Sequence, residues 1–266
     1  MPNSFAKTQG FRLVIQLIFL GLSMMGLVLI WAGFSFAIHA VCPYATVCFG
    51  LNKEVVLGYV NLMFWASILF GLVILVFSMF YGRKFCGYIC PLGTWQEAIF
   101  ALRKARYRRT HRVPYFYERG LGRIKYIILA LTAGLSLAGI GFSFIRLCPF
   151  YALSMLPRLA IPGLSVLIIV SIGGFFTERI WCRWLCPFAA LLNIFQSLGK
   201  QFGIKRSKIR RNLERCVDCG VCMLYCPMNI NIAAEEYVQN NECIHCLVCA
   251  SKCPKKGSLN CEKENS

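Results

Sequence analysis

Apolar residues along the first three quarters of this 266-residue chain gather into four long runs. The runs cover about residues 13–36, 57–81, 124–145 and 159–181. Each is close to the ~20 residues that a helix needs to cross the hydrocarbon core of a bilayer. From about residue 205 onward the sequence has no further run of this kind. The pattern predicts an α-helical membrane protein with four transmembrane helices and a small C-terminal soluble domain.

The four runs form two similar halves. In each half the second run leads to a Cys-x3-Cys-Pro motif, which begins at Cys86 in one half and at Cys182 in the other. An amphipathic segment follows each motif, and Pro91 or Pro187 suits its first helical position. Two spans separate the copies, so both have the same orientation. We expect parallel repeats that are related by a pseudo-twofold axis along the membrane normal.

The net charge of +18 is distributed unevenly over the connecting segments. Residues 83–125 contain eleven Lys or Arg and two Glu, and residues 179–211 contain eight more Lys or Arg. The only Lys or Arg residues on the opposite side are Lys53, Arg146 and Arg158. This positive-inside bias indicates membrane topology and not a nucleic-acid partner. It predicts a multi-pass protein of the bacterial inner membrane, with both termini in the cytoplasm.

The C-terminal region contains two cysteine runs of the form Cys-x2-Cys-x2-Cys-x3-Cys-Pro. In bacterial ferredoxins, three cysteines of such a run hold one [4Fe–4S] cluster and the fourth holds the other. A zinc ribbon is the alternative, but zinc does not require two runs that both end in Cys-Pro. The ligands expected for the first cluster are Cys216, Cys219, Cys222 and Cys253. Those expected for the second cluster are Cys243, Cys246, Cys249 and Cys226.

These patterns give the expected domain boundaries. The membrane domain covers residues 1–204, with repeats at about 12–110 and about 120–204. The cytoplasmic domain covers residues 205–266 and is expected to have the α+β fold of a 2[4Fe–4S] ferredoxin. His245 lies inside one of its cysteine loops and is expected to be exposed, and Cys261 lies outside every pattern.

The Cys-x3-Cys-Pro motifs of the two halves form a candidate metal or redox site at the membrane edge. Its members are Cys86, Cys90, Cys182 and Cys186. A spacing of four would put both thiols of a pair on one helical face, and two pairs across a twofold axis would provide four thiolates. Simple packing of small apolar residues is the alternative. Against packing, six of the ten prolines directly follow a cysteine.

Three further cysteines, Cys42, Cys48 and Cys148, face the opposite side of the membrane in this topology. A disulfide between two of them is one interpretation if that side is oxidising. A second is an additional metal or redox site built from the repeat-related Cys42 and Cys148. A third is packing of the Cys-Pro turns.

Four spans, two Cys-x3-Cys-Pro motifs and eight ferredoxin-type cysteines together resemble the NapH-type membrane ferredoxins and the membrane region of NosR-type proteins. The resemblance covers nearly the whole chain and implies a quinol dehydrogenase component. The chain lacks the outer FMN-binding domain of the NosR type. The segment that begins at Cys86 also resembles CcoG-type proteins, which handle copper during oxidase assembly, but the Ig-like domain of that family is missing.

The resulting functional hypothesis is a membrane-bound electron-transfer subunit of a quinol-linked oxidoreductase system. It would carry two [4Fe–4S] clusters, with a further cluster or metal at the membrane-edge thiols. It would pass electrons between the quinol pool and a redox partner protein, such as a cytochrome, a reductase or a ferredoxin subunit. Copper handling by soft thiolates is an alternative. In a third reading, the ferredoxin domain acts alone and the membrane thiols are structural.

Overall fold

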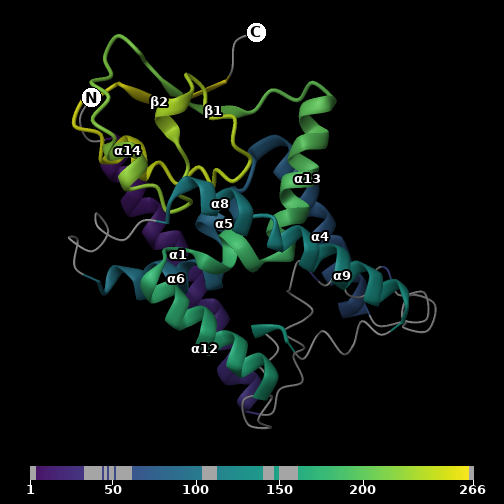
Figure 1. Cartoon of the computed structure of the whole chain (residues 1–266). Coiled ribbons are helices and arrows are strands. Elements are labelled where there is room, and N and C mark those ends of the chain that lie inside the picture. The colour runs from purple at the N-terminus through teal and green to yellow at the C-terminus, as the bar shows by residue number, and fades with distance from the viewer. Residues whose placement is uncertain are drawn as a thin grey trace.

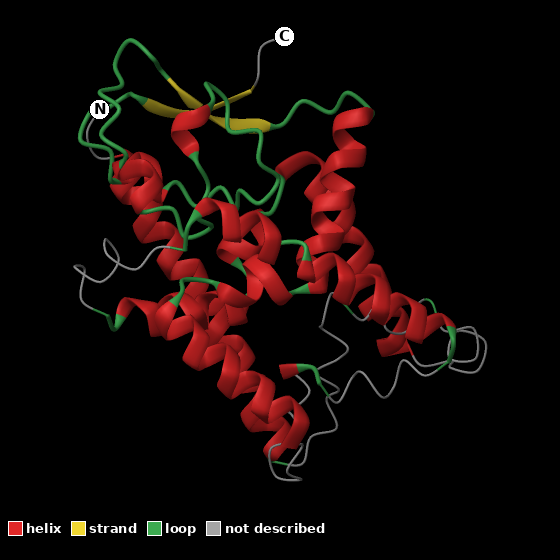
Figure 2. Cartoon of the chain, in the orientation of Figure 1, coloured by secondary structure: helices red, strands yellow, loops and turns green. Residues whose placement is uncertain are grey.

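The computed structural model describes residues 4–32, 44, 47, 51, 62–103, 113–139, 147–149 and 161–263. Helices, one two-stranded sheet and the loops that join them make up the described part of the chain (Figure 2). The helices of the first half are α1 (Ser4–Trp31), α4 (Leu62–Tyr81), α5 (Lys84–Tyr88) and α6 (Pro91–Ala101). Those of the second half are α8 (Tyr115–Leu121), α9 (Ile124–Leu137), α12 (Ile161–Phe176), the π-helix η3 (Trp181–Leu185) and α13 (Pro187–Gln201).

The C-terminal region contains short elements only. These are β1 (Ser207–Arg211), α14 (Val221–Leu224), the 3-10 helix η4 (Ile232–Ala234), α15 (Val248–Ser251) and β2 (Leu259–Lys263). β1 and β2 pair antiparallel, with Ser207 opposite Lys263 and Arg211 opposite Leu259. The expected α+β character of this region is therefore confirmed.

Within the described residues, two helical segments are long and apolar enough to cross a membrane, Lys7–Leu29 and Phe116–Leu137. Only 17% of each apolar window is buried inside the protein, so most of its side chains face outward. The segments Trp65–Tyr81 and Ile161–Phe176 are apolar but shorter within the described residues. α1 begins at Ser4, well before the expected start near residue 13, and α12 ends at Phe176, before the expected end near residue 181.

The apolar helices form two arms (Figure 1). In one arm α6 contacts both α1 and α12, and in the other α13 contacts both α4 and α9. Each arm thus combines two helices of one half with the second apolar helix of the other half. The exchange is the same in both directions, as a pseudo-twofold relation between the halves allows. Gly174 allows the close approach in the first arm, since a Cβ there would lie 3.4 Å from Cγ of Gln96.

Both Cys-x3-Cys-Pro motifs end in the same wide turn. The amide of Cys90 donates to the carbonyl of Phe85 at 3.1 Å, and that of Cys186 donates to Trp181 at 2.8 Å. The second cysteine of each motif is the N-cap of the next helix, and the proline is at the expected first helical position. The second cysteine of each pair therefore lies just outside the short helix that carries the first, because its backbone is extended. Wide π-type turns such as these are frequent at functional sites.

The C-terminal region lies over the ends of the helices, above α5 and α8 in Figure 1. Its apolar side chains and those of the helices share one core. From the helices this core includes Ile74, Leu75, Phe188 and Leu192, and from the C-terminal region Ile209, Ile230, Ile232 and Ile244. Burial of apolar surface therefore holds the two regions together.

Candidate metal centres

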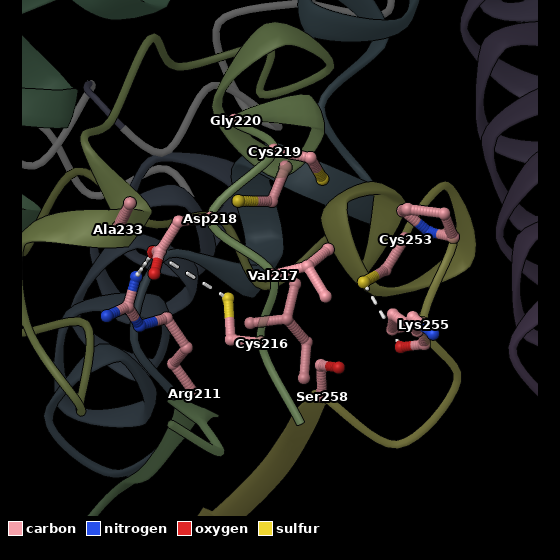
Figure 3. Close-up of a pocket in the computed structure, with 13 residues that line it drawn as sticks. Arg211, Cys216, Val217, Asp218, Cys219, Gly220, Ala233, Cys253, Lys255 and Ser258 are labelled. Carbon is pink, nitrogen blue, oxygen red and sulfur yellow. Dashed lines mark hydrogen bonds and ion pairs between the residues drawn. The ribbon is translucent and has the colours of Figure 1, made fainter. Parts of the chain in front are cut away.

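The four cysteines expected for the first cluster line one pocket of the C-terminal region. Figure 3 shows Cys216, Cys219 and Cys253 around this pocket, and Cys222 also lines it. Cys219 is exposed, whereas the other three are half-buried. The pocket is therefore at the outer surface of the protein.

The four cysteines expected for the second cluster line a separate pocket, which is more deeply buried. They are Cys226, Cys243, Cys246 and Cys249. Side chains such as Ile230, Ile232 and Val238 complete the wall. Cys246 and Cys249 are buried, and burial raises the pKa of Cys243 to about 12. Each pocket is thus lined by the four cysteines that the crossed pattern groups, and their role as cluster ligands stays a prediction.

The two cysteine loops have the same backbone shape. Asp218 and Gly220 have positive φ in the first loop, at 48° and 70°, and His245 and Leu247 have positive φ at the same places in the second, at 51° and 59°. Alternation of right- and left-handed residues makes successive N–H groups converge, as in many Fe–S sites. A left-handed leucine is strained, and such strain is typical of functional sites. The loops therefore fit anionic thiolate-bound clusters.

His245 is buried and not exposed, which corrects the expectation from the sequence. Burial, with help from Lys84 and Arg206, lowers its pKa to about 4. Its ring lies against the helical region, because a Cβ on Gly82 would be 2.9 Å from Nε2 of His245. The loop is covered because the C-terminal region sits on the helix ends.

The four thiols of the Cys-x3-Cys-Pro motifs also lie together. Burial raises the pKa of Cys90, and charge on Cys182, Cys86 and Cys186 raises it further. Burial, together with charge on Cys182 and Cys86, raises the pKa of Cys186 to about 12. Cys86 and Cys182 are buried, and Cys90 and Cys186 are half-buried. Among the described residues, no group of three or more His, Cys, Asp or Glu is close enough to share a single metal ion, and this includes all three quartets.

Two fully buried arginines, Arg83 and Arg179, flank the four thiols. Nη2 of Arg83 donates to the carbonyl of Cys182 at 3.0 Å, and Nη1 of Arg179 donates to that of Cys86 at 2.5 Å. Burial raises the pKa of Cys182 to about 11, although both arginines oppose this rise. Nε of Arg83 and Nη2 of Arg179 are buried without an acceptor in the described part of the chain. Such donors fit a thiolate-ligated cluster, whose sulfur atoms accept hydrogen bonds.

Glu97 on α6 has a carboxylate that binds the positively charged side chains beside the first motif. It accepts hydrogen bonds from Arg12 at 2.5 Å, from Arg179 at 3.0 Å and from Gln16 at 2.8 Å. Arg12 and Gln16 also donate to the carbonyl of Gly87, at 3.1 and 3.0 Å. Burial alone would raise the pKa of Glu97, but Arg179 and Arg12 lower it to about 2. We call this group the Glu97 node.

A second carboxylate, Glu242, has the same role beside the second motif and comes from the C-terminal region. It accepts from Arg83 and Lys125, and from Asn193 at 2.6 Å. Nζ of Lys125 also donates to the carbonyl of Arg183 at 3.2 Å. Burial opposes the ionisation of Glu242, but Arg83 and Lys125 lower its pKa. We call this group the Glu242 node.

Contacts outside the nodes continue the same interface. The side chain of Gln9 donates to the carbonyl of Cys246 at 2.6 Å, and the hydroxyl of Tyr88 donates to that of His245 at 3.3 Å. Arg183 pairs with Glu118, which also accepts from Asn229 at 3.2 Å. The second cysteine loop is thus held directly against the first Cys-x3-Cys-Pro turn.

The remaining candidates lie elsewhere. Cys42 and Cys48 are outside the described residues, and Cys148 is half-buried. Cys261 is exposed on β2. Sequence reasoning missed Glu97, Glu242 and the two arginines. The only signal for them was the arginine three positions before the first cysteine in both halves.

Two family models match the chain. One, described as a 4Fe-4S binding domain, matches twice, at residues 63–110 and 159–205. The other, described as a 4Fe-4S dicluster domain, matches residues 208–254. The double match covers both Cys-x3-Cys-Pro motifs, so the internal repeat is a repeat of one family unit. The chain is therefore a ferredoxin-type protein with sites for two [4Fe–4S] clusters in its C-terminal region.

Curated relatives agree with these matches. YccM of Escherichia coli is 29% identical over 201 residues, which are 73% of this chain and 55% of YccM. MJ0750 of Methanocaldococcus jannaschii is 32% identical over 175 residues, which are 65% of this chain and 69% of that protein. The regulatory protein NosR of Pseudomonas aeruginosa is 28% identical over 174 residues, which are 62% of this chain and 23% of NosR. The chain belongs to the NapH/NosR-like family of iron–sulfur proteins.

The chain spans about half of the length of YccM and less than a quarter of NosR. No solved structure matches it.

Proposed function

We propose that this chain is a membrane-bound iron–sulfur electron-transfer protein that passes electrons between the quinol pool and a redox partner protein. The observation that carries the proposal is one continuous core that contains members of all three cysteine quartets. Cys86 and Cys186 share this core with Cys246 and Cys249 of the second ferredoxin-type quartet, and with Cys222 of the first. Contiguous redox sites are what electron transfer over a distance requires.

The ligand assignment proposed here follows the pockets. Cys216, Cys219, Cys222 and Cys253 would hold the outer cluster, and Cys243, Cys246, Cys249 and Cys226 the inner cluster. We further propose that Cys86, Cys90, Cys182 and Cys186 hold a third iron–sulfur cluster. Support comes from the 4Fe-4S binding model that matches both motifs and from the two unpaired arginine donors beside the thiols.

The membrane is proposed to surround the two arms. Many large apolar side chains of α1, α4, α9 and α12 are exposed, which supports a lipid environment because soluble monomers rarely expose large apolar patches. In this arrangement all four apolar runs cross the bilayer. Arg83 and Lys125 of the first basic segment contact the C-terminal region through Glu242, and the positive-inside rule then orients this end to the cytoplasm.

Each cluster, when bound, supplies one-electron redox chemistry. Oxidation of one quinol to quinone would release two protons to water and two electrons, which two one-electron clusters would be needed to accept. The proposed route runs from the four-thiol site through the buried quartet to the outer quartet. The exposed Cys219 supports docking of a partner protein at the outer quartet.

Iron analysis and quinol reduction of the full chain in detergent test this proposal. We expect about twelve irons and twelve acid-labile sulfides per chain, against about eight if only the ferredoxin-type sites are filled. Menaquinol should bleach the cluster absorbance, and Cys86→Ala/Cys182→Ala should remove about four irons and abolish the bleaching. Cys261→Ala is the matched control and should change neither measurement.

Two results would contradict the proposal. One is an intact chain whose clusters are neither reduced by menaquinol nor oxidised by quinone, as followed by their absorbance. The other is copper that co-purifies in a Cys86-dependent manner in place of the additional iron, which would favour the copper-handling alternative.

A further inference from the structure

The two matched segments of the helical region correspond with an offset of 96 positions, the distance from Cys86 to Cys182 and from residue 63 to residue 159. Arg83 then corresponds to Arg179. Each of these buried arginines donates to the carbonyl of the first cysteine in the opposite half. Each half therefore supplies the arginine that holds the motif of the other.

The cations of the first apolar helices follow the same symmetry. Arg12 of α1 donates to the carbonyl of Gly87, and Lys125 of α9 donates to that of Arg183. Position 183 is the equivalent of position 87. Both cations are buried, and each also binds the carboxylate of its node.

The carboxylates break this symmetry. In the first half the carboxylate is Glu97 of α6, but the equivalent position on α13 is Asn193, which has no charge. In the second half the carboxylate comes from Glu242, the residue before Cys243. Asn193 itself donates to Glu242 at 2.6 Å. The C-terminal region thus provides the group that the second half lacks.

The carboxylate of Glu242 is important for stability because the cations that it binds are buried. Side chains of Arg83 and Lys125 are 0% and 1% exposed, and Glu242 is the carboxylate that both bind. Removing one partner of a buried ion pair is strongly destabilising, because the remaining charge is left without compensation in a low-dielectric site.

We propose that Glu242 is a positioning residue that latches the C-terminal region onto the second half of the four-thiol site, in place of the carboxylate that Asn193 lacks. The four-thiol site then has a complete second half only while the inner cysteine loop is docked. The part of this inference that concerns cluster content rests on the proposed function, whereas the docking part does not.

Limited trypsin digestion and iron analysis of the full chain test the latch. Glu242→Gln should speed cleavage between α13 and β1 on the order of a hundredfold. That change corresponds to about 2.7 kcal/mol of opening free energy. It should also lower the iron content of the four-thiol site. Glu242→Asp keeps the charge and should recover most of the protease resistance.

Moving the carboxylate separates the two roles of Glu242. In Glu242→Gln/Asn193→Glu, the second half has its own carboxylate at the position that Glu97 occupies in the first half. We expect this double variant to recover the iron of the four-thiol site but not the resistance to trypsin. Glu97→Gln is the matched control, and it should lower stability without faster cleavage before β1.

The latch is overturned if Glu242→Gln is cleaved at the rate of the unmodified chain. It is also overturned if Glu242→Gln and Glu97→Gln release the C-terminal region equally, because Glu242 would then have only a general structural role. A chain that contains about eight irons and does not react with quinol contradicts the proposed function, but the trypsin comparison still decides the latch.

Discussion

The two halves of the helical region are alike at their cysteines and different around them. At position 87 the first half has glycine, and a Cβ there would be only 2.7 Å from the carbonyl oxygen of Ile244. At the equivalent position the second half has Arg183, whose side chain extends to Glu118. A symmetric thiol site would have two equivalent positions at which the C-terminal region could dock. The differences between the halves leave only one such position, so the C-terminal region docks in a single orientation.

The largest loss of stability is expected from removing Arg83 or Arg179, because each of them binds the motif of the opposite half. Arg179→Met leaves Glu97 with one arginine and frees the carbonyl of Cys86, so we expect a loss of about 3–5 kcal/mol. Arg83→Met should cost a similar amount, but it should also release the C-terminal region because Glu242 loses a partner. Thermal unfolding followed by tryptophan fluorescence measures the first effect, and trypsin digestion the second. Equal protease sensitivity of the two variants would contradict the assignment of the nodes.

A pH titration isolates the Glu97 node. Because the folded-state pKa of Glu97 is about 2 against an ordinary value of 4.5, its carboxylate stabilises the fold above about pH 4.5. This contribution, about 3 kcal/mol, is lost as the pH falls from 4.5 towards 2. The difference in unfolding temperature between the unmodified chain and Glu97→Gln should therefore shrink over this window. A difference that stays constant down to about pH 3 would show that Glu97 acts through shape and not charge.

The close contact between Gly87 and the backbone of Ile244 is tested by adding one methyl group at position 87. Gly87→Ala pushes on backbone at Ile244 and not on a flexible side chain, so the inner loop must shift, at a cost of about 1–3 kcal/mol. Trypsin cleavage before β1 should accelerate. Gly134→Ala in α9 is the matched control, because a Cβ there meets nothing within 4 Å. It should be neutral or slightly stabilising, and equal effects of the two changes would remove Gly87 from the interface.

The sequence predicted the elements whose signals are local. Apolar runs predicted the helices, and the Cys-Pro steps predicted the helix starts at Pro91 and Pro187. The crossed cysteine spacing grouped the same cysteines that line each pocket, while their role as cluster ligands stays a prediction. Helix ends were less predictable. α12 ends at Phe176 because the chain turns there towards Arg179, which has a φ of 55°.

The nodes could not be predicted because their signals are not local. Arg83 and Lys125 belong to segments whose charge was read, reasonably, as a topology signal. Glu97 contacts Arg179 across 82 positions, and Glu242 contacts Arg83 across 159. Hydropathy and spacing carry no information about such contacts. Only the equivalence of Arg83 and Arg179 is visible in the sequence, and it does not say which carboxylates they bind.

The smallest expected effect comes from ion pairs of the C-terminal region that lie away from the helices. Arg210 pairs with Glu236 at 2.9 Å and with Glu262 at 3.3 Å, but all three side chains are more than two-fifths exposed. Exposed pairs contribute little, because water screens the charges and the long side chains lose entropy when they pair. Arg210→Ala should therefore leave trypsin resistance, iron content and quinol reactivity unchanged. A clear release of the C-terminal region in this variant would mean that any lost ion pair loosens it, and the special role of Glu242 would then have to be abandoned.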